Sequence, residues 1–195
     1  RVEQGRGGER VHEAAGEAAF YGPKIDVHLT DSIGRKHQCG TIQLDFQLPQ
    51  RFELKYVDEK GEFQTPVIIH RAIFGSFERF IAILLEHFAG SLPLWINPRQ
   101  IKIVPVSEKF IEYAKQVKSE LMKYKFFIDI DESDNTLPKK IRAAEVERYN
   151  YVLVVGQKEV DGKTVNVRCR DNDQKSMMII EEFAKEVQKK IDSFM

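Results

Sequence analysis

An arginine stands in the first turn of a predicted apolar helix, within residues 70–80 (His-Arg-Ala-Ile-Phe-Gly-Ser-Phe-Glu-Arg-Phe). Gly75 interrupts the chain there, and Ser76 is a residue type that caps the helix that follows. An arginine is poorly tolerated among apolar helical residues unless its guanidinium meets an anion. The N-terminus of a helix adds partial positive charge and free N–H groups. Arg79 therefore suits a bound nucleotide; the alternative is that Glu78 or another carboxylate pairs with it inside a core.

A second set of polar side chains alternates along residues 39–45. Cys39, Thr41 and Gln43 share one face of a predicted strand, and Lys24 lies on the strand before it. A cysteine and two uncharged hydrogen-bonding side chains suit a small polar ligand. The same alternation is also typical of a solvated face of an antiparallel sheet, so both interpretations stay open.

A Gly-Pro pair, Gly22-Pro23, sets a fixed turn just before that first strand. The turn aims Tyr21 and Lys24 in defined directions. A lysine at this position can bind a carboxylate or a phosphate. The alternative is an ordinary surface lysine at the edge of a strand.

The elements that must position these residues begin with two alternating runs, residues 24–30 and 39–46, separated by a turn at residues 31–35. Together they predict an antiparallel pair of strands. A hairpin turn is predicted at residues 58–62 and a short buried strand at residues 66–69. The helix predicted after Ser76 has so little polar surface that we expect it to be buried.

Two prolines and a glycine within residues 90–98 mark a domain boundary, after which strands and helices alternate. This alternation predicts a mostly parallel sheet covered by helices. The expected fold class is α/β: an α+β part with an antiparallel sheet, residues 1–95, then a three-layer α/β domain, residues 96–195. The predicted strands are residues 101–106, 126–130, 151–155 and 164–169; the predicted helices follow Ser107, cover residues 137–148 and end the chain.

The last predicted hairpin, entered through a turn at Asp161-Gly162, exposes arginine side chains. Asn166, Arg168 and Arg170 alternate outward along residues 164–170. Arginine can stack on unpaired bases and bond to their edges. The alternative is a solvated hairpin without a ligand.

The composition excludes two broad classes. Lysine and arginine together number 30, as do aspartate and glutamate, so the net charge is zero and a non-specific polyanion binder is not expected. No apolar stretch approaches the roughly 18 residues that a membrane helix needs, so no membrane partner is expected. The two cysteines are too few for a disulfide framework and indicate a reducing, intracellular compartment.

Three stretches in this order resemble the closing half of a threonyl-tRNA synthetase catalytic domain: residues 20–26 (Phe-Tyr-Gly-Pro-Lys-Ile-Asp), 38–46 (Gln-Cys-Gly-Thr-Ile-Gln-Leu-Asp-Phe) and 70–80. The third resembles motif 3 of class II synthetases in its threonine-specific form. The resemblance extends from about Ala19 to the end of the chain. It implies that Arg79 and Ser76 hold ATP, and that Lys24, Gln38 and Thr41 line the ATP and adenylate site.

The same resemblance implies that Tyr21, Cys39 and Gln43 surround the amino acid threonine and that His70 is one of three protein ligands to a zinc ion. In this family the zinc takes the amino and hydroxyl groups of threonine directly, which excludes valine. His37 and Cys39 form an alternative zinc pair on one strand face, but such a lone pair is a weak signal.

The second part resembles the anticodon-binding domain shared by the threonyl, prolyl, histidyl and glycyl enzymes. By position, Arg148, Glu159 and Arg168 match the residues that read the anticodon bases in threonyl enzymes. Asp134 departs from the asparagine that bacterial members place there, which puts that one contact in doubt.

The resemblance implies a threonine–tRNA ligase that uses ATP with Mg²⁺ and zinc, acts on threonine and tRNA-Thr in protein biosynthesis, forms a homodimer when complete and works in the cytoplasm, although an organellar enzyme fits as well. Motifs 1 and 2 and two of the zinc ligands are not found in this sequence. The isolated chain is therefore expected to be inactive. Two alternatives are a non-catalytic tRNA-binding or regulatory relative and an unrelated two-domain protein that binds a small ligand.

Overall fold

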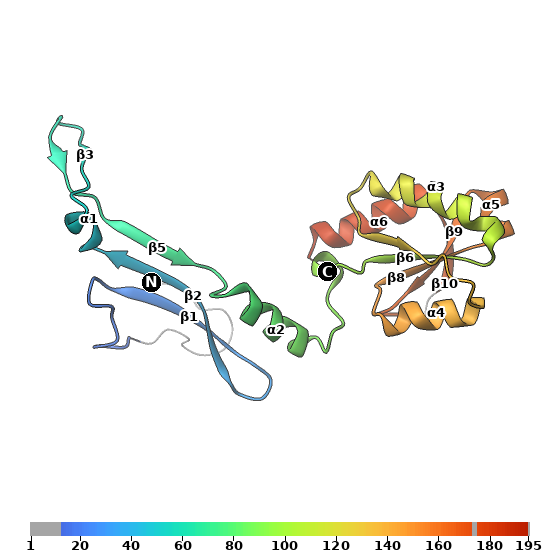
Figure 1. Cartoon of the computed structure of the whole chain (residues 1–195), viewed down its shortest axis with the longest axis horizontal. Helices are drawn as coiled ribbons and strands as arrows, with labels where there is room; N and C mark the ends of the chain where they lie inside the picture. The colour runs from blue at the N-terminus through green and yellow to red at the C-terminus, as the bar shows by residue number, and fades with distance from the viewer. Residues whose placement is uncertain (1–12, 173–174, 195) are drawn as a thin grey trace. The chain divides into compact units, whose positions relative to one another are not determined.

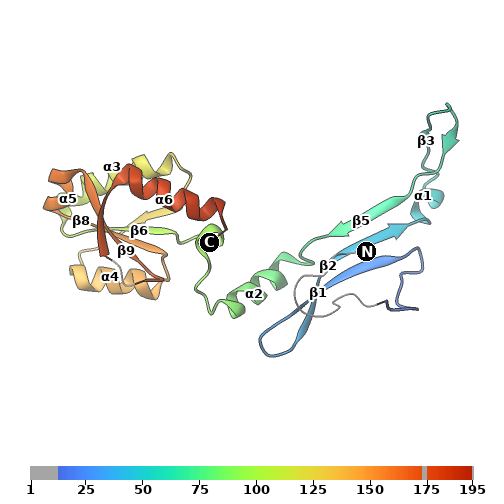
Figure 2. The same ribbon diagram turned by 180° about the vertical axis from the view of Figure 1, so that it is seen from behind.

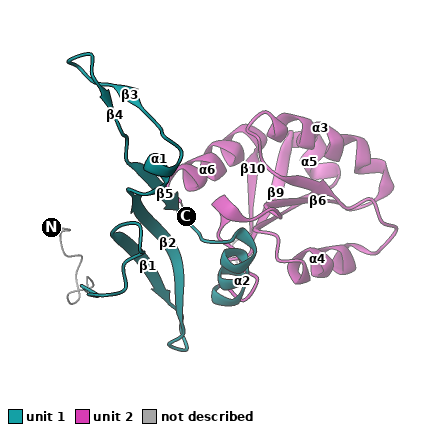
Figure 3. Cartoon of the chain, turned by 60° about the vertical axis from the view of Figure 1, so that its left-hand side comes forward, with its two compact units in different colours: residues 1–87 teal, residues 88–195 magenta. Residues whose placement is uncertain are grey.

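The computed structural model describes residues 13–172 and 175–194 (Figure 1). The chain divides into two compact units, Arg1–His87 and Phe88–Met195 (Figure 3). The boundary expected between residues 95 and 96 stays a prediction. Residues 1–12 of the linker-like N-terminal segment lie outside the described residues, and residues 13–18 contain no helix or strand. Within the described residues, no helix combines the length and apolar character needed to cross a membrane.

The first unit is built on a three-stranded antiparallel sheet in the order β1-β2-β5. The strands are β1 (Lys24–Thr30), β2 (Lys36–Asp45) and β5 (Ile68–Ala72). Asp31 fixes the turn between β1 and β2, because its Oδ1 accepts hydrogen bonds from the N–H groups of Ile33 and Arg35. The predicted antiparallel pair is thereby confirmed.

Three smaller elements and one longer helix complete this unit. Helix α1 (Leu48–Arg51) follows β2, and a short hairpin of β3 (Tyr56–Val57) and β4 (Phe63–Gln64) surrounds the predicted turn at residues 58–62. Helix α2 (Phe77–His87) follows β5.

The expectation that α2 and the strand before it are buried is wrong for this chain. Phe77 is 68% exposed and Ile69 on β5 is 62% exposed. Ile25 on β1 is 64% exposed as well. An apolar face is buried only when another layer packs against it, and in the described part of this unit neither the β3–β4 hairpin nor the helices bury these side chains. The apolar pattern of the sequence is real, but it does not show what covers the apolar face.

The second unit contains a five-stranded sheet in the order β10-β9-β8-β6-β7. Strand β6 (Ile101–Pro105) pairs in parallel with β7 (Ile128–Ile130) and β8 (Tyr151–Val155). Strands β9 (Thr164–Cys169) and β10 (Lys175–Ile179) extend it antiparallel from β8. The α/β fold class is confirmed, and the sheet is mixed rather than mostly parallel.

Helices cover both faces of this sheet (Figure 1 and Figure 2). Helices α3 (Ile111–Met122) and α6 (Ile180–Asp192) pack on one face, where Val117, Leu121, Phe183 and Val187 join the larger apolar core. Helix α4 (Leu137–Val146) packs on the other face with Ile141 and Ala144. Two 3-10 turns, Leu94–Ile96 and Glu108–Phe110, precede β6 and α3.

The turn expected at Asp161-Gly162 is instead the end of a short helix, α5 (Gln157–Gly162). Glu159 explains the difference, because its Oε2 accepts a hydrogen bond from the N–H of Gly156 at 2.9 Å and caps the helix start. Lys163 ends the helix with a left-handed φ of 50°. The capping carboxylate three residues after Gly156 was the signal for a helix.

Candidate functional site

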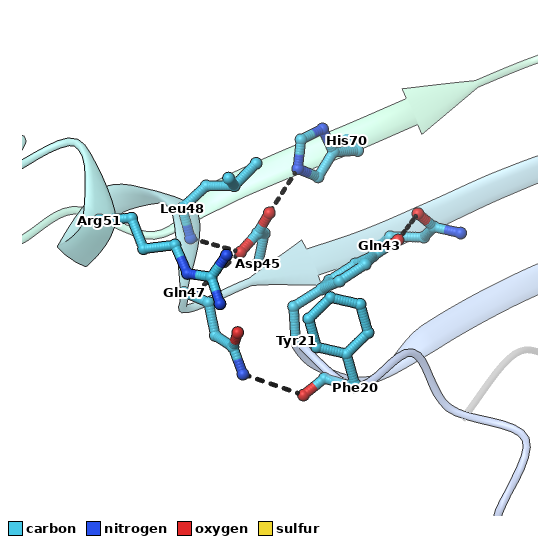
Figure 4. A pocket seen from close by; sticks show the side chains of 8 residues that line it. All are labelled: Phe20, Tyr21, Gln43, Asp45, Gln47, Leu48, Arg51 and His70. Carbon is cyan, nitrogen blue, oxygen red and sulfur yellow. Dashed lines mark hydrogen bonds and ion pairs between the residues drawn. The ribbon is translucent and has the colours of Figure 1, made fainter.

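A cavity of about 310 Å³ opens beside the C-terminal end of β2 (Figure 4). Residues from the turn before β1, from β2, from α1 and from β5 line it. They are Phe20, Tyr21, Gln43, Asp45, Gln47, Leu48, Arg51 and His70. The sheet register explains why these distant residues meet, because Gln43 pairs with Lys24 of β1 on one side and with His70 of β5 on the other.

Three of the residues predicted to bind threonine or zinc lie together in this cavity. The hydroxyl of Tyr21 donates a 2.7 Å hydrogen bond to Oε1 of Gln43. The ring of Tyr21 lies edge-on to the ring of His70, with centroids 6.2 Å apart. Cys39 does not line the cavity: it is 5% exposed and lies opposite an irregularity in the pairing of β1 with β2.

Gly22 allows the turn that carries Tyr21 to lie close to β2, so a larger residue at this position should destabilise the first unit. A Cβ atom at Gly22 would lie 2.3 Å from the carbonyl oxygen of Leu44. Gly22→Ala should therefore lower the free energy of unfolding of the first unit by about 1–3 kcal/mol, measured by urea denaturation of the chain. Glu59→Ala, at an exposed position of the hairpin turn in the same unit, is the control and should change the free energy of unfolding by less than about 0.5 kcal/mol. Unchanged stability of Gly22→Ala would contradict this packing.

Asp45 lines the pocket but is not among the site residues predicted from the sequence. It is 1% exposed, and its Oδ2 lies 2.9 Å from Nε2 of His70. Its Oδ1 accepts hydrogen bonds from the N–H groups of Gln47 and Leu48, each at 2.9 Å. Burial by itself raises the pKa of Asp45, but the N–H of Leu48, the ring of His70 and the N–H of Gln47 together lower it. An aspartate on the face of Gln43, just before a proline-containing turn, was the signal available in the sequence.

Lys24 lies outside the cavity lining and is paired with a carboxylate. Its Nζ is 2.8 Å from Oδ2 of Asp26, and this contact raises the pKa of Lys24 and lowers the pKa of Asp26. Asp26 stands opposite Thr41 in the sheet. Asp26 and Thr41 therefore form a polar row next to the row of Lys24, Gln43 and His70, and the Lys24–Asp26 ion pair joins the two rows.

Arg79 extends from the first turn of α2 to the backbone of β2. Its Nη2 donates a 2.5 Å hydrogen bond to the carbonyl oxygen of Gln38, and its own N–H donates to Oγ of Ser76. Gly75 permits this approach, because a Cβ there would lie 2.7 Å from Nη2 of Arg79. Among the described residues no ion pair joins Arg79 to Glu78 or to any other carboxylate, which removes the alternative of a core ion pair.

The described residues do not form a metal site by themselves. No group of three or more histidine, cysteine, aspartate or glutamate side chains in the described part of the chain could hold a metal ion. His37, half of the alternative zinc pair, contacts Oδ2 of Asp31 at 3.1 Å. His70 contributes one imidazole to its pocket, which does not amount to the three ligands that zinc sites use.

In the second unit, the predicted anticodon residues come from β9, from α5 and from the segment just after α4. Arg168 of β9 stands opposite Val152 of β8 and Lys175 of β10. Its Nε is buried and has no hydrogen-bond partner in the described part of the chain. Glu159 is 8% exposed and engaged in the cap of α5, and Arg148 follows α4 with a φ of 64°. An unpaired buried donor is costly, so Arg168 is the least satisfied of these three side chains.

Two protein families match the chain in succession. Residues 4–88 match the tRNA synthetase class II core domain (G, H, P, S and T), and residues 100–190 match the anticodon binding domain. The probable cytoplasmic threonine–tRNA ligase 1 of Dictyostelium discoideum is 51% identical over 180 residues, 91% of this chain and 25% of that protein. The cytoplasmic threonine–tRNA ligase 1 of Rattus norvegicus is 54% identical over 167 residues, 85% of this chain and 24% of that protein.

A solved structure agrees with these relatives. The crystal structure of the RNA binding domain of threonyl-tRNA synthetase from Cryptosporidium parvum Iowa II matches with a TM-score of 0.80 at 46% identity, over 89% of this chain and 44% of that one. The chain belongs to the threonyl-tRNA synthetase family. It comprises the last part of the class II core and the anticodon-binding domain, so the resemblance seen in the three motifs is confirmed. It spans about a quarter of the length of the curated threonyl-tRNA synthetase relatives that it matches.

Proposed function

We propose that this chain supplies part of the threonine and ATP sites, together with the anticodon interface, of a threonine–tRNA ligase. The reaction is activation of threonine by ATP with Mg²⁺, followed by transfer of the threonyl group to tRNA-Thr. The observation that carries the proposal is identity of about half with threonine–tRNA ligases over nine-tenths of the chain. Because the chain spans a quarter of these proteins, we do not propose that it catalyses the reaction alone. We also propose a cytoplasmic location and a homodimer for the complete enzyme.

The cavity beside β2 is our proposed threonine pocket. A volume of about 310 Å³ suits a small amino acid, and Tyr21, Gln43 and His70 present hydrogen-bonding groups to it. Cys39, which the resemblance also assigned to threonine, is buried outside this lining and is proposed only as a neighbour of the pocket. For zinc the proposal concerns one imidazole, that of His70, and the steps proposed here use protein side chains alone.

We propose that ATP lies along the polar row and the start of α2. One terminal nitrogen of Arg79, Nη2, donates to the carbonyl oxygen of Gln38, and the guanidinium has no carboxylate partner in the described residues, so its remaining N–H groups are available to phosphate oxygens. Lys24, although paired with Asp26, adds a second positive charge nearby. Ser76 and Thr41 complete the proposed site. Fixed charges of this kind stabilise the charge that develops as the phosphate is attacked.

The second unit, taken as residues 96–195, is our proposed anticodon reader. Arg168 supports this best, because its buried Nε lacks an acceptor within the described chain. Arg148 is proposed beside it. Oε2 of Glu159 accepts the hydrogen bond that caps α5, so only Oε1 can bind a base.

Titration of the chain with two fluorescent tRNAs tests the anticodon proposal. One is tRNA-Thr and the other is the same tRNA with an unrelated anticodon. Because the net charge is zero, attraction to the phosphates is weak, and base contacts should decide which tRNA binds more tightly. We expect tRNA-Thr to bind at least about tenfold more tightly, since a base-reading contact contributes about 1–3 kcal/mol. Equal binding of the two tRNAs would refute the proposed anticodon interface.

A further inference from the structure

Asp45 uses both carboxylate oxygens for different partners. Oδ1 accepts from the backbone N–H groups of Gln47 and Leu48, and Oδ2 faces Nε2 of His70 at 2.9 Å. The carboxylate is 1% exposed, whereas the His70 side chain is 42% exposed. The buried group therefore anchors the exposed ring, from the end of β2 to the middle of β5.

The hydrogen-bond roles in this contact are set by chemistry. A carboxylate can only accept, so the histidine nitrogen that faces it must carry the proton. In a neutral imidazole the other nitrogen then has a free lone pair. Figure 4 shows Nδ1 of His70 pointing away from Asp45, and no hydrogen bond joins it to a described residue.

We infer that Asp45 is a positioning residue that holds His70 as its Nε2–H tautomer and leaves the Nδ1 lone pair as the reactive atom of the ring. A hydrogen bond from a ring N–H to a carboxylate both orients an imidazole and increases the basicity of its other nitrogen. Nδ1 thereby becomes the electron-pair donor of the ring. This inference rests on the proposed function only for the identity of the ligand that receives that lone pair.

The chain contains a second contact between an aspartate and a histidine, which serves as a control. Asp31 also accepts two backbone N–H groups with Oδ1, those of Ile33 and Arg35, and its Oδ2 faces Nε2 of His37 at 3.1 Å. Unlike Asp45, it also accepts a 2.6 Å hydrogen bond from Nε of Arg35 with Oδ2. Neither Asp31 nor His37 lines the cavity. A change at Asp31 should affect His37 and leave His70 as it is.

Asp45→Asn is the informative substitution. The two backbone N–H groups require an oxygen at the Oδ1 position, so the amide NH₂ must occupy the Oδ2 position. It then points a donor at Nε2 of His70, which must accept, and the ring proton moves to Nδ1. Free imidazole already favours the Nε2–H tautomer. A change of His70 to the Nδ1–H tautomer in Asp45→Asn would therefore show that the new amide group donates to Nε2.

Long-range ¹H–¹⁵N spectra of the whole chain measure the tautomers directly. They are recorded at about pH 8.5, roughly two units above the ordinary imidazole pKa of about 6.5. We expect wild-type His70 to be Nε2–H in at least about tenfold excess, and Asp45→Asn to reverse that preference. Asp31→Asn, which also removes an acceptor of the Arg35 guanidinium, should leave the tautomer of His70 unchanged. The same His70 tautomer in wild type and Asp45→Asn, or an Nδ1–H form in wild type, would overturn the inference.

If Asp45→Asn does not fold, a second measurement on the wild-type chain tests the inference. The wild-type Nε2–H proton of His70, held by a buried carboxylate, should exchange slowly with solvent and give a resolved resonance; rapid exchange would overturn the inference. Both measurements need no threonine, ATP or metal. They therefore remain valid if the proposed function fails, and threonine binding can fail while the tautomer result stands.

Discussion

Replacing Arg79 with alanine is expected to slow threonine-dependent ATP–pyrophosphate exchange by about 10²–10³-fold, a loss of roughly 3–4 kcal/mol of transition-state stabilisation. The assay uses a hybrid enzyme, the Dictyostelium discoideum relative with its 180 matching residues replaced by this chain. The expectation follows from the position of Arg79. Its guanidinium is fixed by the carbonyl of Gln38, and no described carboxylate neutralises it. A preorganised cation of this kind costs no reorganisation when the phosphate charge develops.

Arg71→Ala is the matched control for Arg79→Ala. Arg71 is an exposed arginine in the same stretch, one residue after His70 and so on the opposite face of β5. Its removal should leave exchange within about threefold of the unmodified hybrid, because surface substitutions away from a site have small effects. Near-normal exchange by Arg79→Ala, with Arg71→Ala equally active, would refute the ATP assignment. Binding of tRNA-Thr should survive both changes.

Arg168→Ala should weaken binding of the chain to tRNA-Thr by about 1–3 kcal/mol, the range for a base-reading contact. Arg168 is half-buried and its Nε has no hydrogen-bond partner among the described residues, so its guanidinium is not committed to a contact within the described chain. Binding to the tRNA with the unrelated anticodon should hardly change. Fluorescence titrations at two salt concentrations give the affinities for both tRNAs.

Lys175→Ala controls for charge, because Lys175 is exposed and stands opposite Arg168 on β10. A phosphate-contacting cation weakens binding to both tRNAs alike and lowers the salt slope. If Arg168→Ala behaved in that way, Arg168 would only position the RNA. If it had no effect on either tRNA, the hairpin would be a solvated surface.

The local elements could be predicted because they depend on local patterns. The alternation of residues 24–30 and the turn at Asp31 give the β1–β2 pair as observed. Strand β10 could not be separated from α6, because its apolar residues Met178 and Ile179 run directly into the apolar stripe of that helix. The α5 helix was missed because a Gly in Asp161-Gly162 resembles a hairpin turn, while the cap by Glu159 decides the outcome.

Burial and pairing in the site depend on contacts distant in sequence. Tyr21, Gln43 and His70 were named from motifs, and the register of three strands brings them to one cavity. The pattern places Asp45 on the face of Gln43, but it does not show the contact with His70, which lies 25 residues away. The apolar faces of α2 and β5 are exposed. An apolar pattern predicts a buried surface, but it does not identify the layer that buries it.

Charging of tRNA-Thr by the hybrid enzyme tests the central claim most directly. The measurement follows attachment of radioactive threonine to tRNA-Thr, with valine as the competing amino acid. If this chain supplies part of the threonine and ATP sites and the anticodon interface of a threonine–tRNA ligase, the hybrid should charge threonine at a rate comparable with the parent enzyme and reject valine. A folded hybrid that binds tRNA-Thr but attaches no threonine would contradict the claim and favour a non-catalytic tRNA-binding relative.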